Sequence, residues 1–590
     1  MEQNEKTVYE LQPNTKQVTK SDEPQQTTQS REQTSAHPAH SGEHLLDTKP
    51  AAQEQSAGDS SKNQKSLVRS GISLSFLTLL SRILGLIREM TKAAFLGTSF
   101  LADAYTFAFQ LPNLFRRLFA ENSISVAFIP TFKSYLEQEQ TDPAKKEETK
   151  EFLKATFTLI SFLTTVFTLL GIILAPLITP FFTESTDPEL ISEMAVLTRI
   201  MFPYLIVISI AAFFQGILNG MKIFAPSGFT PVLFNLIVVL ATYLLSPYTA
   251  NPARAMSIGV ISGGSVQALF QLPFVLKQHR TVQFTTLKKA FTNPGTRKVL
   301  RLVAPTIFGM AAYQLNDLVS MWLAGNAGPG IQSSLSYSLR LQELILGIFA
   351  VSVGTVILPD LTSFAEKKLN KEFDELLLSS IRIITLIAIP VTFFAMTFSE
   401  SLIRLVYKSK NFTEESVMLT NKAFLCHMTG LFFIAVNRII SPAFYAKKNT
   451  KSPTIAGVVC FAVNMAVAAC LAKPFQGAGI AFALSIASAV NTVVLFIFLR
   501  KKQIADAKFM IKGTLLYVLR ILVFSVAATI VPMLIKKPLF ALFNTGNRFI
   551  DQGVPLVICG IIFAAVGVLL LVITKDPLIS KITGKFIRRK

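Results

Sequence analysis

The chain has 590 residues and is poor in the side chains on which most metal and redox enzymes depend. It holds four cysteines, five histidines and one tryptophan. The cysteines (Cys426, Cys460, Cys470 and Cys559) lie in apolar segments without a C-x-x-C pair, which favours small buried hydrophobes over a disulfide or metal framework. Neither H-E-x-x-H nor G-x-x-x-x-G-K-[ST] occurs. We expect no metal site, no bound cofactor and no ATP hydrolysis through a phosphate loop.

Acidic residues are scarce beside basic ones, with 36 Asp and Glu against 57 Lys and Arg and a formal net charge of +21. In a soluble protein this excess would suggest a nucleic-acid partner. Here most Lys and Arg lie in short loops between apolar runs, and no basic stripe with interleaved aromatics lies outside those runs, so we exclude nucleic-acid binding. Apolar residues make up 51% of the chain. Runs of about 20 apolar residues recur from residue 70 to 574, which predicts an all-α integral membrane protein.

About fourteen transmembrane helices are expected, and the loops between them set the orientation. The loops after even-numbered spans carry most of the Lys and Arg, which places them and both termini in the cytoplasm. We call the opposite loops, which follow odd-numbered spans, the odd loops. The expected spans are 69–96, 102–136, 150–182, 188–220, 226–247, 254–276, 298–324, 331–360, 376–399, 414–445, 453–472, 476–499, 513–535 and 553–574.

A weak internal repeat predicts two lobes. The fourth span leads through Lys222 and Pro226 into a helix with Asn235, and the tenth leads through Lys447 and Pro453 into a helix with Asn464. An offset of six spans keeps the orientation, so the halves would be parallel six-helix repeats around a central cavity. The expected parts are a disordered polar cytoplasmic tail (1–65), an N-lobe (66–290), a C-lobe (291–505), two C-terminal helices (506–575) and a basic cytoplasmic tail (576–590).

Charged residues gather in the first two spans, where lipid contact would cost about 2.5–3.5 kcal/mol for each charge at the bilayer centre. Structural ion pairs, or side chains snorkelling from the span ends, are one interpretation. Cations outnumber anions, however, so pairing leaves positive charge over, and the forked guanidinium suits phosphate oxygens. We therefore favour a polar cavity that binds an anion. The charged residues are Arg82, Arg88, Glu89, Lys92, Asp103, Arg116, Arg117 and Glu121, with isolated Arg199, Asp317, Arg340, Glu343, Arg382, Arg438 and Arg520 in later spans.

Three strings carry a resemblance to a known family: Ser-Arg-Ile-Leu-Gly-Leu-Ile-Arg-Glu from residue 81, Leu-Pro-Asn-Leu-Phe-Arg-Arg-Leu-Phe-Ala-Glu from residue 111, and Phe-Pro-Tyr from residue 202. They resemble the MurJ (MviN) family of bacterial lipid II flippases, within the multidrug/oligosaccharidyl-lipid/polysaccharide exporter superfamily. The resemblance implies alternating access between two lobes, with a groove for the lipid tail at the last two helices. It implies substrate-binding roles for Ser81, Arg82, Arg88, Glu89, Asp103, Asn113, Arg116, Glu121 and Arg340. In the second span, Asp103, Gln110 and Arg117 repeat every seven residues, and this polar stripe on an apolar helix predicts a cavity wall and adds Arg117 to the site.

The resemblance also implies a transporter and not an enzyme, located in the bacterial cytoplasmic (inner) membrane. Its partners would be membrane lipids and lipid II, the undecaprenyl-diphosphate-linked disaccharide-pentapeptide, and the chain would act as a monomer. Some family members hold sodium between an acidic residue of the seventh span and residues of the eleventh. Asp317 and Asn464 could serve here, but Ala468 stands where a second acid is expected. Asp317 could equally pair with a neighbouring residue instead. Sodium or chloride therefore remains open as a counter-ion.

Other functions stay open. The same architecture could export another lipid-linked oligosaccharide or an organic cation, although a cation exporter would favour acidic residues in its cavity. A membrane glycosyltransferase or phosphotransferase would need an Asp-rich metal motif or a sizeable domain outside the membrane. The longest loop between spans, about residues 277–297, contains no acidic residue. A scaffold without transport would leave the charged cavity without a purpose.

Overall fold

A computed structural model describes residues 77–118, 124–280, 282–576 and 578, without the side chains of 308–313 and 348–356. Every regular element in these ranges is a helix, so the predicted all-α class is confirmed. The polar tail 1–65, most of the basic tail 576–590 and Glu121 lie outside the described residues.

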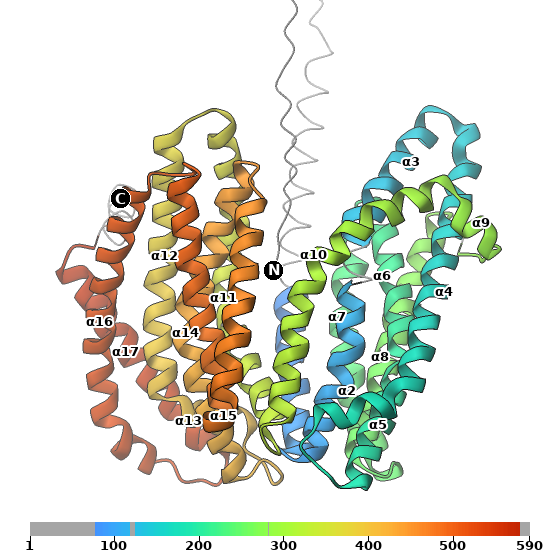
Figure 1. The fold of residues 1–590 in the computed structure, drawn as a ribbon. Coiled ribbons are helices and arrows are strands. Elements are labelled where there is room, and N and C mark those ends of the chain that lie inside the picture. The colour runs from blue at the N-terminus through green and yellow to red at the C-terminus, as the bar shows by residue number, and fades with distance from the viewer. Residues whose placement is uncertain (1–76, 119–123, 281, 577, 579–590) are drawn as a thin grey trace, which may run out of the picture. The chain divides into compact units, whose positions relative to one another are not determined.

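The first group of helices packs around one hydrophobic core, formed by residues between Leu96 and Met321. Aromatic side chains fill much of it, including Phe128, Phe152 and Phe213, all fully buried. We call this group the first bundle (Figure 1, blue to green). Its elements are a helix over residues 77–96, α2 (Phe100–Arg116), η2 (Ile124–Phe128), α3 (Ile129–Thr141), α4 (Lys146–Ile178), α5 (Pro188–Met201), α6 (Tyr204–Gly220), α7 (Ala225–Leu245), α8 (Pro252–Lys277) and α9 (Leu287–Thr292).

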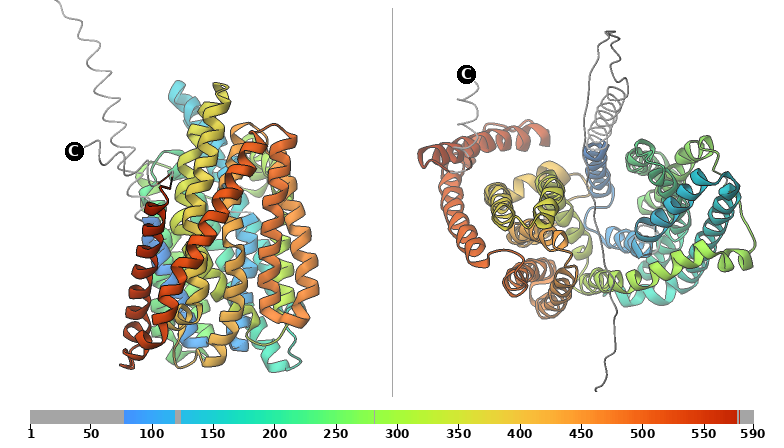
Figure 2. Two further views of the ribbon diagram at one scale, coloured as in Figure 1. Left: turned by 90° about the vertical axis from the view of Figure 1, so that its left-hand side faces the viewer. Right: turned by 90° about the horizontal axis from the view of Figure 1, so that it is seen from above.

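The second group surrounds a separate core that runs from Tyr337 to Met510 and takes in Ala93. We call this group the second bundle; Figure 2 shows it beside the first. The last two helices pack on its outer side through Tyr517, Ile521 and Cys559. The elements of the second bundle are α11 (Ile331–Glu366), α12 (Asn370–Thr397), α13 (Ser399–Tyr407), α14 (Glu414–Ala446), α15 (Lys451–Lys501), α16 (Ala507–Ala541), η6 (Phe549–Gly553) and α17 (Val554–Ile573). The helix α10 (Pro294–Gly325) joins the two bundles: Val299, Val303 and Met321 belong to the first core, and its end packs on α15.

Several predicted span limits agree with helix ends to within a few residues, but the count of fourteen is not confirmed. Among the described residues, nine helices are long and apolar enough to cross a membrane. Spans 453–472 and 476–499 form one element, α15, with a break at Gln476, whose φ is +48°. Span 188–220 is divided into α5 and α6 at Phe202–Pro203, because proline cannot donate the hydrogen bond that would continue the helix.

The cysteines are all free. Cys559 is buried as predicted, but Cys426 and Cys460 are half-buried and Cys470 is exposed. In a membrane protein an apolar helix face needs no protein cover, because lipid supplies an apolar surrounding. The apolar sequence around Cys470 therefore predicted an apolar environment, but the prediction that this cysteine is buried within the protein was wrong.

Candidate functional site

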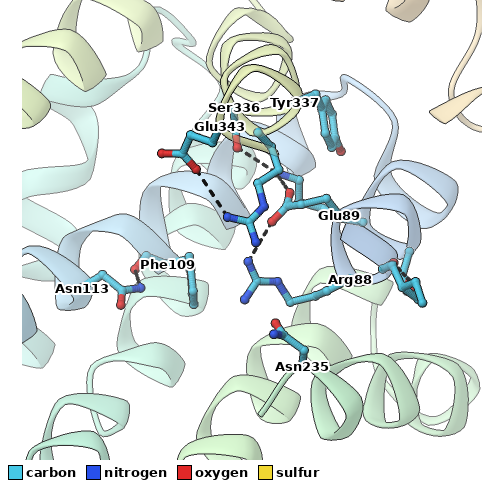
Figure 3. Close-up of polar contacts among 12 residues, drawn as sticks. Arg88, Glu89, Phe109, Asn113, Asn235, Ser336, Tyr337 and Glu343 are labelled. Carbon is cyan, nitrogen blue, oxygen red and sulfur yellow. Dashed lines mark hydrogen bonds and ion pairs between the residues drawn. The ribbon is translucent and has the colours of Figure 1, made fainter. Parts of the chain in front are cut away.

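The helix over residues 77–96 carries a compact group of charges on its inner side. Glu89 pairs with two cations at once: its Oε1 lies 2.9 Å from Arg88 Nη2, and its Oε2 lies 3.0 Å from Lys92 Nζ. All three side chains are at least 86% buried. We call Arg82, Arg88, Glu89, Lys92 and Arg340 the central charge cluster; Figure 3 shows part of it. A single carboxylate between two cations leaves the buried trio positive.

Aromatic rings from three other helices cover these cations. The Arg88 guanidinium lies 5.3 Å from the Phe109 ring of α2 and 5.7 Å from the Phe234 ring of α7. Lys92 lies 4.3 Å from the Tyr337 ring of α11. The faces of aromatic rings attract cations but carry no net negative charge. The rings therefore stabilise the two cationic side chains without neutralising them. Lys92 Nζ also donates to Ser336 Oγ at 3.1 Å.

Two arginines and two glycines interlock the helix over 77–96 with α11. The Arg340 guanidinium of α11 lies against Gly85, and the Arg82 guanidinium lies against Gly347 of α11. A Cβ at either glycine would overlap the facing guanidinium. Arg340 Nη1 also pairs with Glu343 Oε2 at 3.4 Å, at a more exposed position. The absence of side chains at Gly85 and Gly347 thus creates the space in which both arginines lie.

The start of the helix over 77–96 contacts α7. Asn235 donates from Nδ2 to the carbonyl of Ser81 at 3.3 Å and to the carbonyl of Pro231 at 2.9 Å. Figure 3 shows Asn235 beside Arg88. This helix of the first bundle therefore lies at the junction with the second bundle, with α7 on one side and α11 on the other, and its charges face that junction.

The predicted residues at the end of α2 form a second polar group. Arg116 Nε donates to Asn113 Oδ1 at 2.9 Å, and Asn113 Nδ2 donates to the Phe109 carbonyl at 2.8 Å. Arg117 Nη1 pairs with Asp317 Oδ2 of α10 at 3.0 Å, with both side chains about 40% exposed. The ring of Phe109 links the two groups, because Arg88 lies over it.

Asp103 lies apart from the other predicted site residues. Its two carboxylate oxygens accept from the backbone N–H groups of Gly330 at 2.6 Å and Ser333 at 2.7 Å. Both donors belong to the start of α11, where a negative charge is favoured. Asp103 is 8% exposed, whereas Gln110 and Arg117 are exposed, so this stripe does not form one cavity wall as the heptad spacing predicted.

The two residues predicted for an ion site have different partners here. Asp317 pairs with Arg117, and Asn464 of α15 donates from Nδ2 to Asn316 Oδ1 at 2.7 Å. Ala468, four residues after Asn464, is buried and occupies the position where a second acid was expected. Among the described residues, no group of three or more His, Cys, Asp and Glu side chains could hold a metal ion. A sodium site at Asp317 and Asn464 stays a prediction.

The sequence analysis counted Lys92 among the charges of the cavity but not among the substrate-binding residues, and it did not assign Gly85, Gly347 or Asn235 to the site. Lys92 carries a signal, because it lies three residues from Glu89 and so on nearly the same helix face. The two glycines carry none, since a glycine in an apolar helix most simply indicates close packing. The sequence does not reveal which group packs against each glycine.

Comparison with known proteins fits this arrangement. A family model described as "Lipid II flippase MurJ" matches residues 92–546. The chain belongs to the MurJ family. It is 45% identical over 522 residues to the "Probable lipid II flippase MurJ" of Treponema pallidum, covering 88% of this chain and 98% of that protein. It is 31% identical over 443 residues to the "Lipid II flippase MurJ" of Burkholderia cenocepacia, covering 74% and 84%.

Solved structures agree. A lipid II flippase MurJ in an "inward closed conformation" matches with a TM-score of 0.70 at 26% identity, over 86% of this chain and all of the other. An inward-facing multidrug resistance MATE transporter of the MOP superfamily matches with a TM-score of 0.58 at 14% identity, over 72% and 95%, which shows a shared fold only. The chain is therefore a multi-pass bacterial membrane protein of a transporter family.

Proposed function

We propose that this protein flips lipid II from the inner to the outer leaflet of the cytoplasmic membrane for cell-wall synthesis. Its family and its relatives' names support this function. The observation that carries it is the central charge cluster, which keeps surplus positive charge buried between two helical bundles. A cavity with this charge suits a diphosphate, whose oxygens accept from guanidinium groups.

The substrate's chemistry explains why a protein is needed. Lipid II has an anionic diphosphate, a polar sugar-peptide head and a long apolar tail. Polar groups that enter hydrocarbon without partners cost several kcal/mol each. Arg82, Arg88, Arg340 and Arg116 would replace the water around the diphosphate, while Ser81, Glu89, Asn113 and Arg117 supply further polar contacts. The tail would remain in lipid, along the groove of α16 and α17.

The bundles would rock to expose this site to one side at a time. In this structure their odd-loop ends are joined. Asp103 caps α11, Thr98 Oγ1 lies 2.8 Å from Ser416 Oγ, and Asn411 Nδ2 donates to the carbonyls of Ala94 and Phe95. With the odd loops outside and both termini in the cytoplasm, this arrangement corresponds to a state that is closed to the outside. One chain supplies both bundles, so a monomer suffices.

Leaflet accessibility of lipid II tests the function directly. Bacteria depleted of their own flippase would express the wild-type chain, Arg340→Ala or Arg116→Ala. Arg500→Ala is the matched control, because Arg500 is exposed in the last turn of α15, away from the cluster. We expect wild type and control to restore outward exposure of lipid II, and both site variants to lose it at normal membrane levels.

Two results would contradict the proposal. If folded, inserted wild type restored no lipid II exposure, the substrate would be a different lipid-linked oligosaccharide. If Arg340→Ala and Arg116→Ala worked as well as Arg500→Ala, the flippase assignment would stand and the arginine site would be wrong.

A further inference from the structure

Arg199 of α5 is a charged residue in a membrane helix that the transport site does not use. It lies on the face of the first bundle where α5 packs along α4, and its side chain is exposed. Its Nε donates to the carbonyl of Ile172 at 3.2 Å. That carbonyl lacks its usual helical donor, because Pro176, four residues later, has no N–H. This bond uses one of the five guanidinium N–H donors and leaves the others for a second partner.

A pocket of about 340 Å³ lies beside this guanidinium. Its size is within the range of small-ligand sites. Its apolar lining, which we call the apolar wall, consists of Pro176, Pro188, Ile191 and Ala195. The polar lining consists of Arg199, Thr179, Thr186 and Ser192. A cation and three hydroxyl groups beside an apolar wall suit a ligand with a phosphate and a hydrocarbon part.

Thr179 gives a second, independent indication of a ligand. It is fully buried, and its Oγ1 has no hydrogen-bond partner among the described residues. A buried hydroxyl without a partner costs about 1–3 kcal/mol. Thr179 lines the pocket with its hydroxyl covered, so a ligand oxygen would remove that cost by displacing the atoms that cover the hydroxyl.

The surroundings place the pocket at the edge of the membrane. Ile173 and Leu177 of α4 are 65% and 64% exposed, as expected for side chains that face lipid. α5 begins at the odd loop that follows the third span, and side chains on a helix lean toward its N-terminus, so Arg199 leans toward the headgroup layer. Asp187 and Glu189 are exposed at this end and disfavour a ligand with surplus negative charge.

We propose that this pocket binds the phosphodiester of a membrane phospholipid, with Arg199 and Thr179 as its donors and the acyl chains along the apolar wall. The acidic residues at its mouth favour a zwitterionic headgroup. The bound lipid would brace α4 against α5 next to Phe202, where the chain turns into α6 and the Phe202 ring packs on Gly171. This site is separate from the central charge cluster and does not depend on which substrate is transported.

Native mass spectrometry of the purified full chain tests the site, with phosphatidylethanolamine added in detergent. Arg199→Gln keeps a donor for the Ile172 carbonyl and removes the charge, and we expect about tenfold weaker binding of one lipid. Thr179→Val has nearly the same shape and removes only the unpartnered hydroxyl, and we expect several-fold weaker binding with normal folding. Arg500→Gln is the control and should bind lipid as wild type does.

Equal lipid occupancy in Arg199→Gln, Thr179→Val and the control would overturn the proposal. Glycerophosphoethanolamine, which has the phosphodiester and no acyl chains, should compete poorly; competition as strong as that of the lipid would overturn the assignment to a membrane lipid. If Arg199→Gln failed to fold, the comparison of Thr179→Val with the control would decide. The flipping assay above reads a different property, so failure of either proposal leaves the other testable.

Discussion

At the scale of single residues, the site depends on side chains that are absent as much as on those that are present. Arg82 extends from the helix over 77–96 to α11, where its guanidinium packs on Gly347. Arg340 extends from α11 to the helix over 77–96, where its guanidinium packs on Gly85. An arginine held in this way loses conformational freedom before substrate arrives, which lowers the entropic cost of binding. Gly85 and Gly347 therefore act as positioning residues for the two cations.

The first prediction concerns these glycines. Gly347→Ala and Gly85→Ala should each reduce lipid II flipping about tenfold, because the new Cβ displaces a guanidinium by more than a hydrogen bond tolerates. Gly457→Ala on α15 is the matched control, since nothing lies within 4 Å of a Cβ at that glycine. All three changes favour the helix itself by up to about 1 kcal/mol. Equal flipping by all three would show that the positions of the arginines do not matter.

The second prediction concerns Glu89, the carboxylate between Arg88 and Lys92. Glu89→Gln should leave two buried cations without a counter-charge and destabilise the protein by about 3–5 kcal/mol, as measured by thermal unfolding in detergent. Glu343→Gln is the comparison, because that side chain is 53% exposed and its pair with Arg340 is worth at most about 1 kcal/mol. A melting temperature equal in both variants would show that Glu89 does not hold the cluster together.

At the scale of elements, the odd-loop ends of the helices decide which side of the site is closed. The start of α11 is held by Asp103, and Gly330 before it has a φ of +77°, which a residue with a side chain rarely adopts. The turn after the helix over 77–96 adds Gly97 with a φ of +59°, whose carbonyl accepts from Tyr337 at 2.9 Å. Backbone groups and short side chains thus make a closure that can separate without exposing large apolar surfaces.

The third prediction tests this closure. In a chain with its four native cysteines replaced, Thr98→Cys and Ser416→Cys together should form a disulfide, because the native hydroxyls lie 2.8 Å apart. The bond should stop flipping, and a reducing agent should restore it. Each single replacement is the control and should flip under both conditions. A disulfide-bonded chain that still flips would show that these ends need not separate during transport.

At the scale of the whole molecule, the protein combines two bundles, each with its own apolar core, with a positively charged junction between them. Separate cores let each bundle move as a unit, while the junction supplies the polar contacts that a headgroup needs in place of water. Relative motion of the bundles would then change access to the charges without unfolding either core.

The fourth prediction concerns energy. With an inside-negative potential of about 100 mV, outward movement of each negative charge gains about 2.3 kcal/mol, and inward return of an empty cationic site is also favoured. Collapse of the potential in intact cells should therefore slow lipid II flipping at least several-fold, as measured by leaflet accessibility. Exchange of sodium or chloride for other ions at constant potential is the control. Unchanged flipping after collapse would exclude the potential as the driving force.

Much of this could be predicted from the sequence. The length of the apolar runs predicted the helices. A helix that faces lipid must form all its backbone hydrogen bonds within itself and must present an apolar surface. The predicted limits of α7, α10 and α14 agree with the helix ends within four residues, because the length of an apolar run limits where a membrane helix begins and ends. The charges of the first span also indicated a buried polar site, because no other place in a membrane tolerates them.

Partners and pairings were decided only by the tertiary structure. The heptad spacing of Asp103, Gln110 and Arg117 fixes their direction on one helix, but it does not reveal that the start of α11 lies over Asp103 alone. The family resemblance left two options for Asp317, an ion site with Asn464 or a pair with a neighbour, and in the structure Asp317 pairs with Arg117 at 3.0 Å. Gly85 and Gly347 have no chemistry of their own and acquire a role from the arginines that approach them. The sequence determines which side chains each helix carries and on which face they lie. The packing of one helix on another decides which of those side chains come into contact.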